Sequence, residues 1–314
     1  MACCYLIQSH TQPGQVLRLV ETIKQSSPNA RVLAVHDATG SALDPAPFEK
    51  YDHVKVIAQK VRVARGEMSV LTPLFTGLEE LLGREGGRPR WDFDWLVYLS
   101  GQDYPTRPVR GIEESLATSG VDGFLSHWGI EPGAERNPWR PGQGRTRYLA
   151  QYRRFPDWTL GLLKGVRFLG KVSPLRFHLH YGPFVGWQPR TAPFSESFRC
   201  YGGWQWWTLS RAAVEHFWDF FRSRPEVIDW FRHTVCPCES LVPTVVANSG
   251  RFAIHPDNRR YADFAGSRDG RPRTLGASDF ATITGGRYDF ARKLDLAKSP
   301  EILDLLDAEV LGAR

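Results

Sequence analysis

The sequence predicts an α/β fold in which helices flank a Rossmann-like, mostly parallel central sheet. A short apolar strand pattern at Cys4–Ser9 is followed by an amphipathic helix that begins at Pro13 and by a second strand at Arg31–His36. A strand, a helix and a strand within about 35 residues form a βαβ unit, which requires parallel strands. The apolar run Trp95–Ser100 predicts a buried strand of the same sheet.

The rest of the chain continues this alternation. Further strands are predicted at Val54–Ile57, Gly123–Ser126, Arg176–Gly186, Trp204–Leu209, Arg251–Ile254 and Arg259–Phe264. Helices are predicted at Met68–Leu82, Arg110–Thr118, Leu160–Leu169, Arg211–Arg222 with Ser210 as its N-cap, Gly276–Thr284 and Pro300–Leu311. Gly129–Gly161 has weak periodicity and is predicted to be a long loop over the ligand-binding face, either an acceptor-binding insertion or a plain surface excursion.

The composition is that of a globular protein with an unusual aromatic content. Hydrophobic residues make up 42% and charged residues 24% of the 314 residues, without an internal repeat, so one domain is expected. The 11 Trp residues suit sugar faces, although tryptophan in a core is commoner. A net charge of +6 favours an anionic ligand or surface without choosing between nucleotide-sugar, nucleic acid and membrane.

The five cysteines lack the spacing of a metal site or a redox motif. Cys236 and Cys238 are separated by one residue, and Cys3, Cys4 and Cys200 stand apart from them. We expect reduced thiols, no membrane span and a cytoplasmic location.

Polar residues follow two of the predicted parallel strands, where ligands of such sheets bind. Ser9 and Asp37 end the first two strands, and Gln102 and Asp103 follow Trp95–Ser100. Asp37 either caps a turn or accepts hydrogen bonds from a nucleotide base or ribose. Gln102 and Asp103 are candidates for contact with a sugar.

The segment Cys200–Asn248 contains the first candidate for catalysis. Glu239 lies two residues after Pro237 and just before the apolar run Leu241–Val246, so it is expected at a helix N-terminus. There it either complements the helix dipole or acts as a general base beside aromatic walls.

The Trp-rich run of the same segment is expected to form a wall for donor or acceptor sugar through Trp204, Gln205 and Trp206. Side chains alternate along a strand, so either Trp204 and Trp206 or Gln205 and Trp207 should face the site.

Basic residues gather on both sides of the predicted helix Gly276–Thr284. The loop Ser267–Thr274 contains Arg268, Arg271 and Arg273, and Arg292 and Lys293 follow the helix. These side chains either bind phosphate groups or form a solvated surface.

Two patterns are candidates for a metal, and neither is favoured. His178 and His180 are two residues apart on a predicted strand, without an evident third ligand. Asp92-Phe93-Asp94 precedes a strand and is expected at the edge of the sheet opposite the site, in solvent.

The order of the motifs resembles the core 2/I-branching β-1,6-N-acetylglucosaminyltransferase family, which includes the peptide O-xylosyltransferases. The matching pieces are YLIQSH…VLAVHD, WLVYLSGQDYP, GGWQWWTLSRAAV, CPCESLVPT and GASDF…FARKLD. They run the length of the chain in family order, and Gly129–Arg199 matches poorly. The resemblance implies a glycosyltransferase A-type fold and an inverting reaction that needs no divalent metal or other cofactor.

The resemblance also assigns roles to residues. Glu239 matches the general base, Lys293 with Arg292 and either Arg271 or Arg273 match the diphosphate-binding residues, and Asp37 matches the acidic residue that contacts the uridine. Ile7 and Ser9, on the first strand, are further candidates for nucleotide binding. Cys238 replaces the family's Asp, and Arg65-Gly66-Glu67 replaces its Trp-Gly-Gly. The expected parts are 1–126 (nucleotide-sugar binding), 127–199 (variable, acceptor side) and 200–314 (catalysis and diphosphate binding).

The expected function is transfer of a sugar, first of all N-acetylglucosamine, from a UDP-sugar to a hydroxyl of a carbohydrate or small-molecule acceptor. Alternatives are UDP-xylose as donor, a natural product or a modified DNA base as acceptor, and a non-catalytic sugar- or nucleotide-binding protein. Nucleic acid is the less favoured partner.

Overall fold

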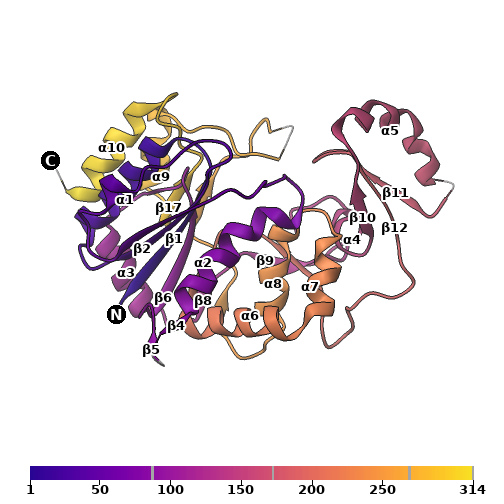
Figure 1. Ribbon diagram of the computed structural model, residues 1–314, viewed down its shortest axis with the longest axis horizontal. Helices are drawn as coiled ribbons and strands as arrows, with labels where there is room; N and C mark the ends of the chain where they lie inside the picture. Colours follow the sequence, from indigo (N-terminus) through magenta and orange to yellow (C-terminus); the bar gives the residue numbers. More distant parts are fainter. Residues whose placement is uncertain (86–87, 172, 268–269, 313–314) are drawn as a thin grey trace.

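A computed structural model of the protein describes residues 1–85, 88–171, 173–267 and 270–312. A seven-stranded sheet has the order β15-β8-β14-β6-β1-β2-β3, and all its neighbours are parallel except β14, which is antiparallel to β6 and β8 (Figure 1). Its strands are β1 (Cys3–Ser9), β2 (Arg31–Asp37), β3 (Val54–Gln59), β6 (Trp95–Ser100), β8 (Gly123–Phe124), β14 (Thr208–Ser210) and β15 (Ile254–His255). The predicted α/β fold with a mostly parallel sheet is confirmed.

Helices pack on both faces of this sheet. The described helices are α1 (Pro13–Ser26), α2 (Thr72–Leu82), α3 (Val109–Ala117), α4 (Gln143–Tyr148), α5 (Leu160–Val166), α6 (Arg211–Ser223), α7 (Pro225–Arg232), α8 (Leu241–Ala247), α9 (Phe280–Thr284) and α10 (Pro300–Leu311). Of these, α1, α3 and α10 pack on one face of the sheet, and α2, α6 and α8 pack on the other. Side chains alternate along β1: Tyr5 and Ile7 pack with α1, α3 and α10, whereas Cys4 and Leu6 pack with α2, α6 and α8. No described helix is long and apolar enough to cross a membrane.

Smaller sheets extend the fold. They contain β4 (Arg84–Glu85) with β5 (Arg88–Pro89), β7 (Tyr104–Pro105) with β16 (Arg260–Ala262) and β17 (Phe290–Arg292), β9 (His127–Gly129) with β13 (Tyr201–Gly203), and β10 (Gln151–Arg154) with β11 (Leu175–His178) and β12 (Phe184–Trp187). The β10-β12-β11 sheet and α5 form a lobe that projects at the right of Figure 1. Strands from 1–126 and from 200–314 share the central sheet, and the functional division of the chain stays a prediction.

Several local predictions are confirmed in detail. The last helix has the predicted bounds, and the Ser210 hydroxyl accepts a hydrogen bond from the Ala213 N–H at 3.3 Å as the N-cap of α6. The predicted helix Met68–Leu82 begins as a 3₁₀ turn, Met68–Leu71, and becomes α-helical at Thr72.

Other local predictions are wrong. Trp204–Trp207 is not a strand but a bend between β13 and β14, so the expected alternation does not apply there. Gly129–Gly161 is not a continuous loop, because α4 and β10 form within it. Arg176–Gly186 divides into the hairpin strands β11 and β12, and the strand predicted at Arg251–Ile254 is reduced to Ile254–His255.

Candidate active site

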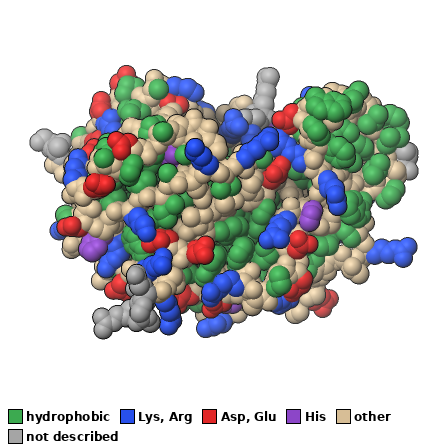
Figure 2. Space-filling view, in the orientation of Figure 1, with side chains coloured by type: hydrophobic (Ala, Val, Ile, Leu, Met, Phe, Trp, Pro, Cys, Tyr) green, Lys and Arg blue, Asp and Glu red, His purple; other side chains and the backbone are tan. Residues whose placement is uncertain are grey.

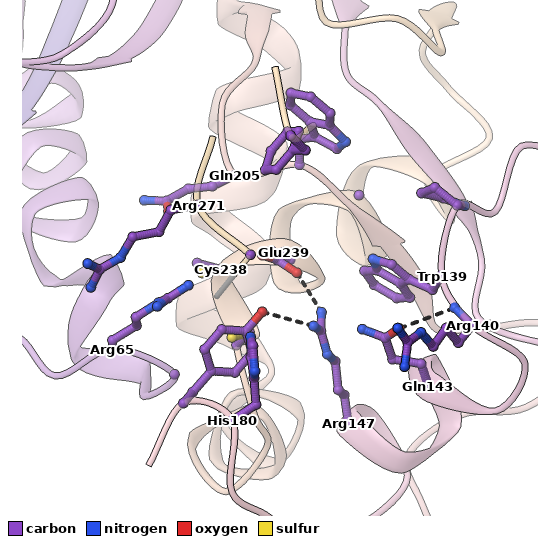
Figure 3. A pocket seen from close by; sticks show the side chains of 18 of the residues that line it. Arg65, Trp139, Arg140, Gln143, Arg147, His180, Gln205, Cys238, Glu239 and Arg271 are labelled. Carbon is purple, nitrogen blue, oxygen red and sulfur yellow. Dashed lines mark hydrogen bonds and ion pairs between the residues drawn. The ribbon is translucent and has the colours of Figure 1, made fainter. Parts of the chain in front are cut away.

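A cavity of about 1040 Å³ lies between the sheet, α4 and the loop before α9, which is large for a small-molecule site. Aromatic residues form much of its wall, among them Trp128, Trp139, Tyr181, Trp204 and Trp206. Among the described residues, five arginines line it with one carboxylate, namely Arg65, Arg140, Arg147, Arg271 and Arg292 with Glu239. Figure 3 shows all of them but Arg292 with labels. Such a lining suits an anion with flat, partly apolar groups.

Glu239 ends a 3₁₀ turn, Pro237–Glu239, that leads directly into α8. Cys236 starts this turn in the left-handed region with φ of 57°, and its N–H donates to the Gly66 carbonyl at 2.8 Å. The Glu239 N–H closes the turn onto the Cys236 carbonyl at 3.0 Å. The backbone therefore fixes the carboxylate at the cavity wall, where its side chain is 30% exposed.

Arg147, on α4, holds the Glu239 carboxylate from behind. Its Nη1 donates to Glu239 Oε2 at 2.6 Å, and its Nη2 donates to the Tyr181 hydroxyl at 3.0 Å (Figure 3). The guanidinium is 5% exposed and lies over the rings of Trp139 and Tyr181. Burial lowers the pKa of Arg147, but the Glu239 charge together with Tyr148, Cys236 and Tyr181 raises it above its ordinary value. Arg147 is thus a fixed cation.

Sequence reasoning missed Arg147. It lies in a helix of only six residues, inside the segment predicted to be a loop, and its partner is 92 residues away. The only feature of the sequence that pointed to Arg147 is the high arginine content between Gly129 and Gly161, and this content does not distinguish Arg147 from the other arginines.

Arg292, at the end of β17, also lines the cavity, and a buried carboxylate supports it. Its Nε lies 3.4 Å from Asp103 Oδ1, and its guanidinium lies 4.6 Å from the centre of the Trp206 ring. Burial lowers the pKa of Arg292, and the Asp103 carboxylate opposes that shift. Asp103 itself is fully buried beside Arg292 and does not line the cavity, and its predicted contact with a sugar stays a prediction.

The two candidate arginines of the loop before α9 have different surroundings. Arg271 is exposed and lines the cavity. Arg273 is not among the lining residues, because it binds Asp263 at 2.6 Å and Asp279 at 2.5 Å. The structure therefore places Arg271, not Arg273, at the site, and Arg268 lies outside the described residues.

Lys293 lies beside the cavity rather than in its wall. Burial lowers its pKa, and the neighbouring charges of Arg271 and Arg292 add to the shift. The Leu275 N–H donates to the Lys293 carbonyl at 2.9 Å, which holds this segment next to the Arg271 loop. Lys293 thus belongs to the same cationic cluster.

The ends of β1 and β2 lie close to these cations. Burial lowers the pKa of His10, the Asp37 carboxylate opposes this shift, and the charges of Lys293 and Arg271 add to it, so His10 lies within electrostatic reach of all three groups. Asp37 Oδ1 accepts from the Thr39 N–H at 2.9 Å and hydroxyl at 2.7 Å, so the turn-capping alternative holds for that oxygen. The Ser9 hydroxyl is 2.8 Å from His36 Nδ1.

Two predicted contact residues do not reach the site with their side chains. Ile7 is fully buried in the core against α1, because the odd-numbered side chains of β1 face that helix. Its side chain does not reach the cavity, and a nucleotide contact through its backbone stays a prediction. Gln102 is not among the lining residues; its carbonyl accepts from the Leu294 N–H at 3.0 Å and supports the segment that carries Lys293.

The bend Trp204–Trp207 brings three consecutive side chains to the cavity. Trp204, Gln205 and Trp206 all line it, whereas Trp207 is buried in the core. Trp204 meets Phe264 edge-on at 5.3 Å between ring centres, and Gln205 Nε2 lies 3.4 Å from both Gln8 Oε1 and the Tyr98 hydroxyl. Because this bend is not paired as a strand, its side chains need not alternate between two faces. All three residues predicted to form the sugar wall therefore line the cavity.

Both departures from the family pattern lie at the cavity. Cys238 packs among apolar residues, and burial raises the pKa of its thiol, so it replaces a carboxylate with a small apolar side chain. Arg65 lines the cavity and lies 4.7 Å from the centre of the Tyr181 ring, while Glu67 pairs with Arg154 at 3.3 Å.

The residues considered as metal ligands are not grouped into one site. Among the described residues, no three His, Cys, Asp or Glu side chains are grouped to hold an ion. His178 stacks on Tyr181 at 5.3 Å, and burial with the Arg147 charge lowers its pKa to about 4. Asp94 accepts from the Ala2 N–H at 2.7 Å at the opposite edge of the sheet. All five cysteines are buried as free thiols.

Comparisons with known proteins agree with the expected family. The chain is 23% identical to beta-glucuronosyltransferase GlcAT14B of Arabidopsis thaliana, over 98% of this chain and 65% of that protein. It is 22% identical to xylosyltransferase 2 of Rattus norvegicus, over 84% of this chain and 28% of that protein. It therefore spans less than two thirds of either relative. Mouse xyloside xylosyltransferase 1, apo form, is 9% identical with a TM-score of 0.38, covering 93% of this chain and 97% of that one.

The family model described as Core-2/I-Branching enzyme matches residues 4–284, nearly the whole chain. The resemblance seen in the motifs is thereby confirmed, and the names of the relatives support the predicted glycosyltransferase class. The protein belongs to the Core-2/I-Branching enzyme family.

Proposed function

We propose that this protein is an inverting glycosyltransferase that moves a sugar from a UDP-sugar to an acceptor hydroxyl without a divalent metal. The observation that carries the proposal is the charge of the cavity, which five guanidinium groups and one carboxylate of the described residues line. A leaving nucleoside diphosphate develops negative charge, and fixed cations stabilise it without reorganisation. Arg271 and Arg292, with Lys293 beside them, are assigned to the diphosphate.

The nucleotide is assigned to the ends of β1 and β2. Asp37 and Ser9 lie there, and the pKa of His10 responds to the charges of Arg271 and Lys293, so this edge is close to the cations. A uridine at this edge would leave its diphosphate beside them. The sugar is then assigned to the aromatic wall at Trp204, Gln205 and Trp206.

Glu239 is assigned as the general base. Arg147 holds its Oε2, so Oε1 is the oxygen assigned to accept the proton of the acceptor hydroxyl. The hydroxyl oxygen forms a bond to the anomeric carbon as the bond to the diphosphate breaks on the opposite face, which inverts the configuration. Arg147 touches Glu239 and acts as a positioning residue.

UDP-N-acetylglucosamine is the first donor to test and UDP-xylose the second. Two observations favour UDP-glucuronic acid as a further candidate: the cavity contains Arg65 and Arg140 besides the arginines assigned to the diphosphate, and one relative is named a glucuronosyltransferase. A uronate carboxylate would pair with such a guanidinium.

UDP release from these three donors, with and without EDTA, tests the proposal. Turnover that survives EDTA and is lost in Glu239→Gln, with UDP binding retained, is expected. Loss of turnover in EDTA with recovery on added metal would contradict metal independence. UDP binding without turnover on any donor would favour the non-catalytic alternative, and salt-sensitive DNA binding would favour the modified-base acceptor. The predicted cytoplasmic location is proposed from the free thiols alone.

A further inference from the structure

Exposed apolar side chains are concentrated on the lobe Gln151–Trp187. Of the eleven large hydrophobic residues that are exposed in the described part of the chain, seven lie on this lobe. They form what we call the apolar lobe surface, namely Phe155, Trp158, Leu162, Val166, Phe168, Leu175 and Trp187, with exposed fractions from 37% to 76%. Figure 2 shows hydrophobic side chains gathered over the projecting lobe on the right of the view. A concentration of this kind marks an interaction surface.

Helix α5 has no buried residue, although it contains three leucines and a valine. A helix of seven residues is too short to be stable by itself in water, and most helices depend on packing of an apolar face. Leu162 and Val166 are four residues apart and share one side of α5, and the exposed Trp158 lies in the 3₁₀ turn just before it. Leu175 and Trp187 are directly paired across β11 and β12. These side chains therefore form an apolar surface of the kind that a binding partner covers.

The charge of the lobe indicates which partner. Between Gln151 and Trp187 the sequence has six Lys or Arg and one Asp, so the net charge of this segment is +5, compared with +6 for the whole chain. Lys164 and Arg167 are exposed between the apolar positions of the helical segment. Lys and Arg interleaved with Trp, Phe and Leu are typical of segments that lie in the interface of an anionic bilayer.

We propose that the lobe Gln151–Trp187 docks on the surface of an anionic lipid bilayer, with the apolar lobe surface inserted among the headgroups and the basic side chains paired with lipid phosphates. Insertion covers the apolar side chains, and the lipid charge complements the basic ones. The turn after β11 carries His180 and Tyr181 into the cavity wall. Docking therefore holds the cavity next to the membrane.

Sedimentation with vesicles tests this proposal on the whole chain. Binding is expected to phosphatidylcholine vesicles that contain about 30% phosphatidylglycerol, and it should be weak on phosphatidylcholine alone. Raising the salt from about 0.1 M to about 1 M should weaken binding, because the Debye length falls from roughly 10 Å to 3 Å. The double variant Leu162→Glu/Phe168→Glu should lower the vesicle partition coefficient roughly tenfold or more. Lys164→Gln/Arg167→Gln should lower it by a similar factor without changing the apolar side chains.

Leu305→Glu is the matched control. Leu305 is 40% exposed on α10, away from the lobe, so its variant should bind vesicles like the unmodified protein. Circular dichroism should give unchanged unfolding midpoints for all variants, which separates lost docking from lost folding. The proposal is overturned if anionic vesicles are not bound, if neutral vesicles are bound equally well, or if the lobe and control variants bind alike. Light scattering that shows a dimer lost in the lobe variant would assign the surface to a second copy instead.

Discussion

Two carboxylate–arginine pairs lie at the cavity. In one pair the carboxylate is the more exposed partner, and in the other pair the arginine is. In the first, the Glu239 carboxylate faces the cavity with 30% exposure, and Arg147 behind it is 5% exposed. In the second, the Arg292 guanidinium faces the cavity with 13% exposure, and Asp103 behind it is fully buried. The exposed partner can meet a substrate, whereas the buried partner fixes its position. One pair therefore presents a base and the other a cation, although both contain the same two functional groups.

The largest effect is expected from removing the exposed carboxylate. Glu239→Gln keeps the size of the side chain and can still bond to Arg147, but it cannot accept the proton. Initial rates of UDP release should fall about 10²–10⁴-fold. UDP affinity, measured by calorimetry, should be unchanged, and a matching loss of UDP affinity would show that Glu239 belongs to the binding site instead.

Removing the exposed cation of the second pair should weaken donor binding and also stability. Arg292→Met deletes a charge-assisted contact worth about 1.5–3 kcal/mol, so UDP affinity should fall roughly 10–100-fold. It also leaves Asp103 buried without its partner, which costs about 3–5 kcal/mol of unfolding free energy.

The double variant Arg292→Met/Asp103→Asn separates these two effects. The Asp103→Asn change removes the buried charge, so stability in urea should recover while UDP affinity stays low. Recovery of both would mean that Arg292 does not contact the diphosphate.

Removing the buried cation of the first pair should affect catalysis rather than binding. Arg147→Met frees the Glu239 carboxylate from its position, and kcat should fall about tenfold for the loss of one charged hydrogen bond while KM for the donor changes little. Arg147→Lys keeps one donor and should restore part of kcat. If Arg147 had only a structural role, the variant would have a lower Tm and an unchanged kcat. Thermal unfolding and steady-state kinetics of the same variants distinguish these outcomes.

The smallest effects are expected in the loop before α9, where two arginines are two residues apart. Arg271→Ala should lower UDP affinity up to about fivefold, because exposed charge pairs contribute up to about 1 kcal/mol. Arg273→Ala should leave UDP affinity unchanged and lower the unfolding free energy by no more than about 1 kcal/mol, since its ion pairs with Asp263 and Asp279 are partly exposed. The opposite result would reassign the diphosphate contact to Arg273.

Local periodicity and turn chemistry by themselves determined the first βαβ unit, the Ser210 cap and the last helix, because each depends on neighbours within a few residues. The order of the motifs likewise determined the family, and it indicated Glu239 as the candidate general base. Only the tertiary structure decided which residues meet: Arg147 with Glu239 across 92 positions, Arg292 with Asp103, and Arg271 rather than Arg273 at the cavity. It also decided that Trp204, Gln205 and Trp206 share one wall. A periodic pattern records which face of an element is apolar, but it contains no distance between elements, so these pairings follow from packing alone.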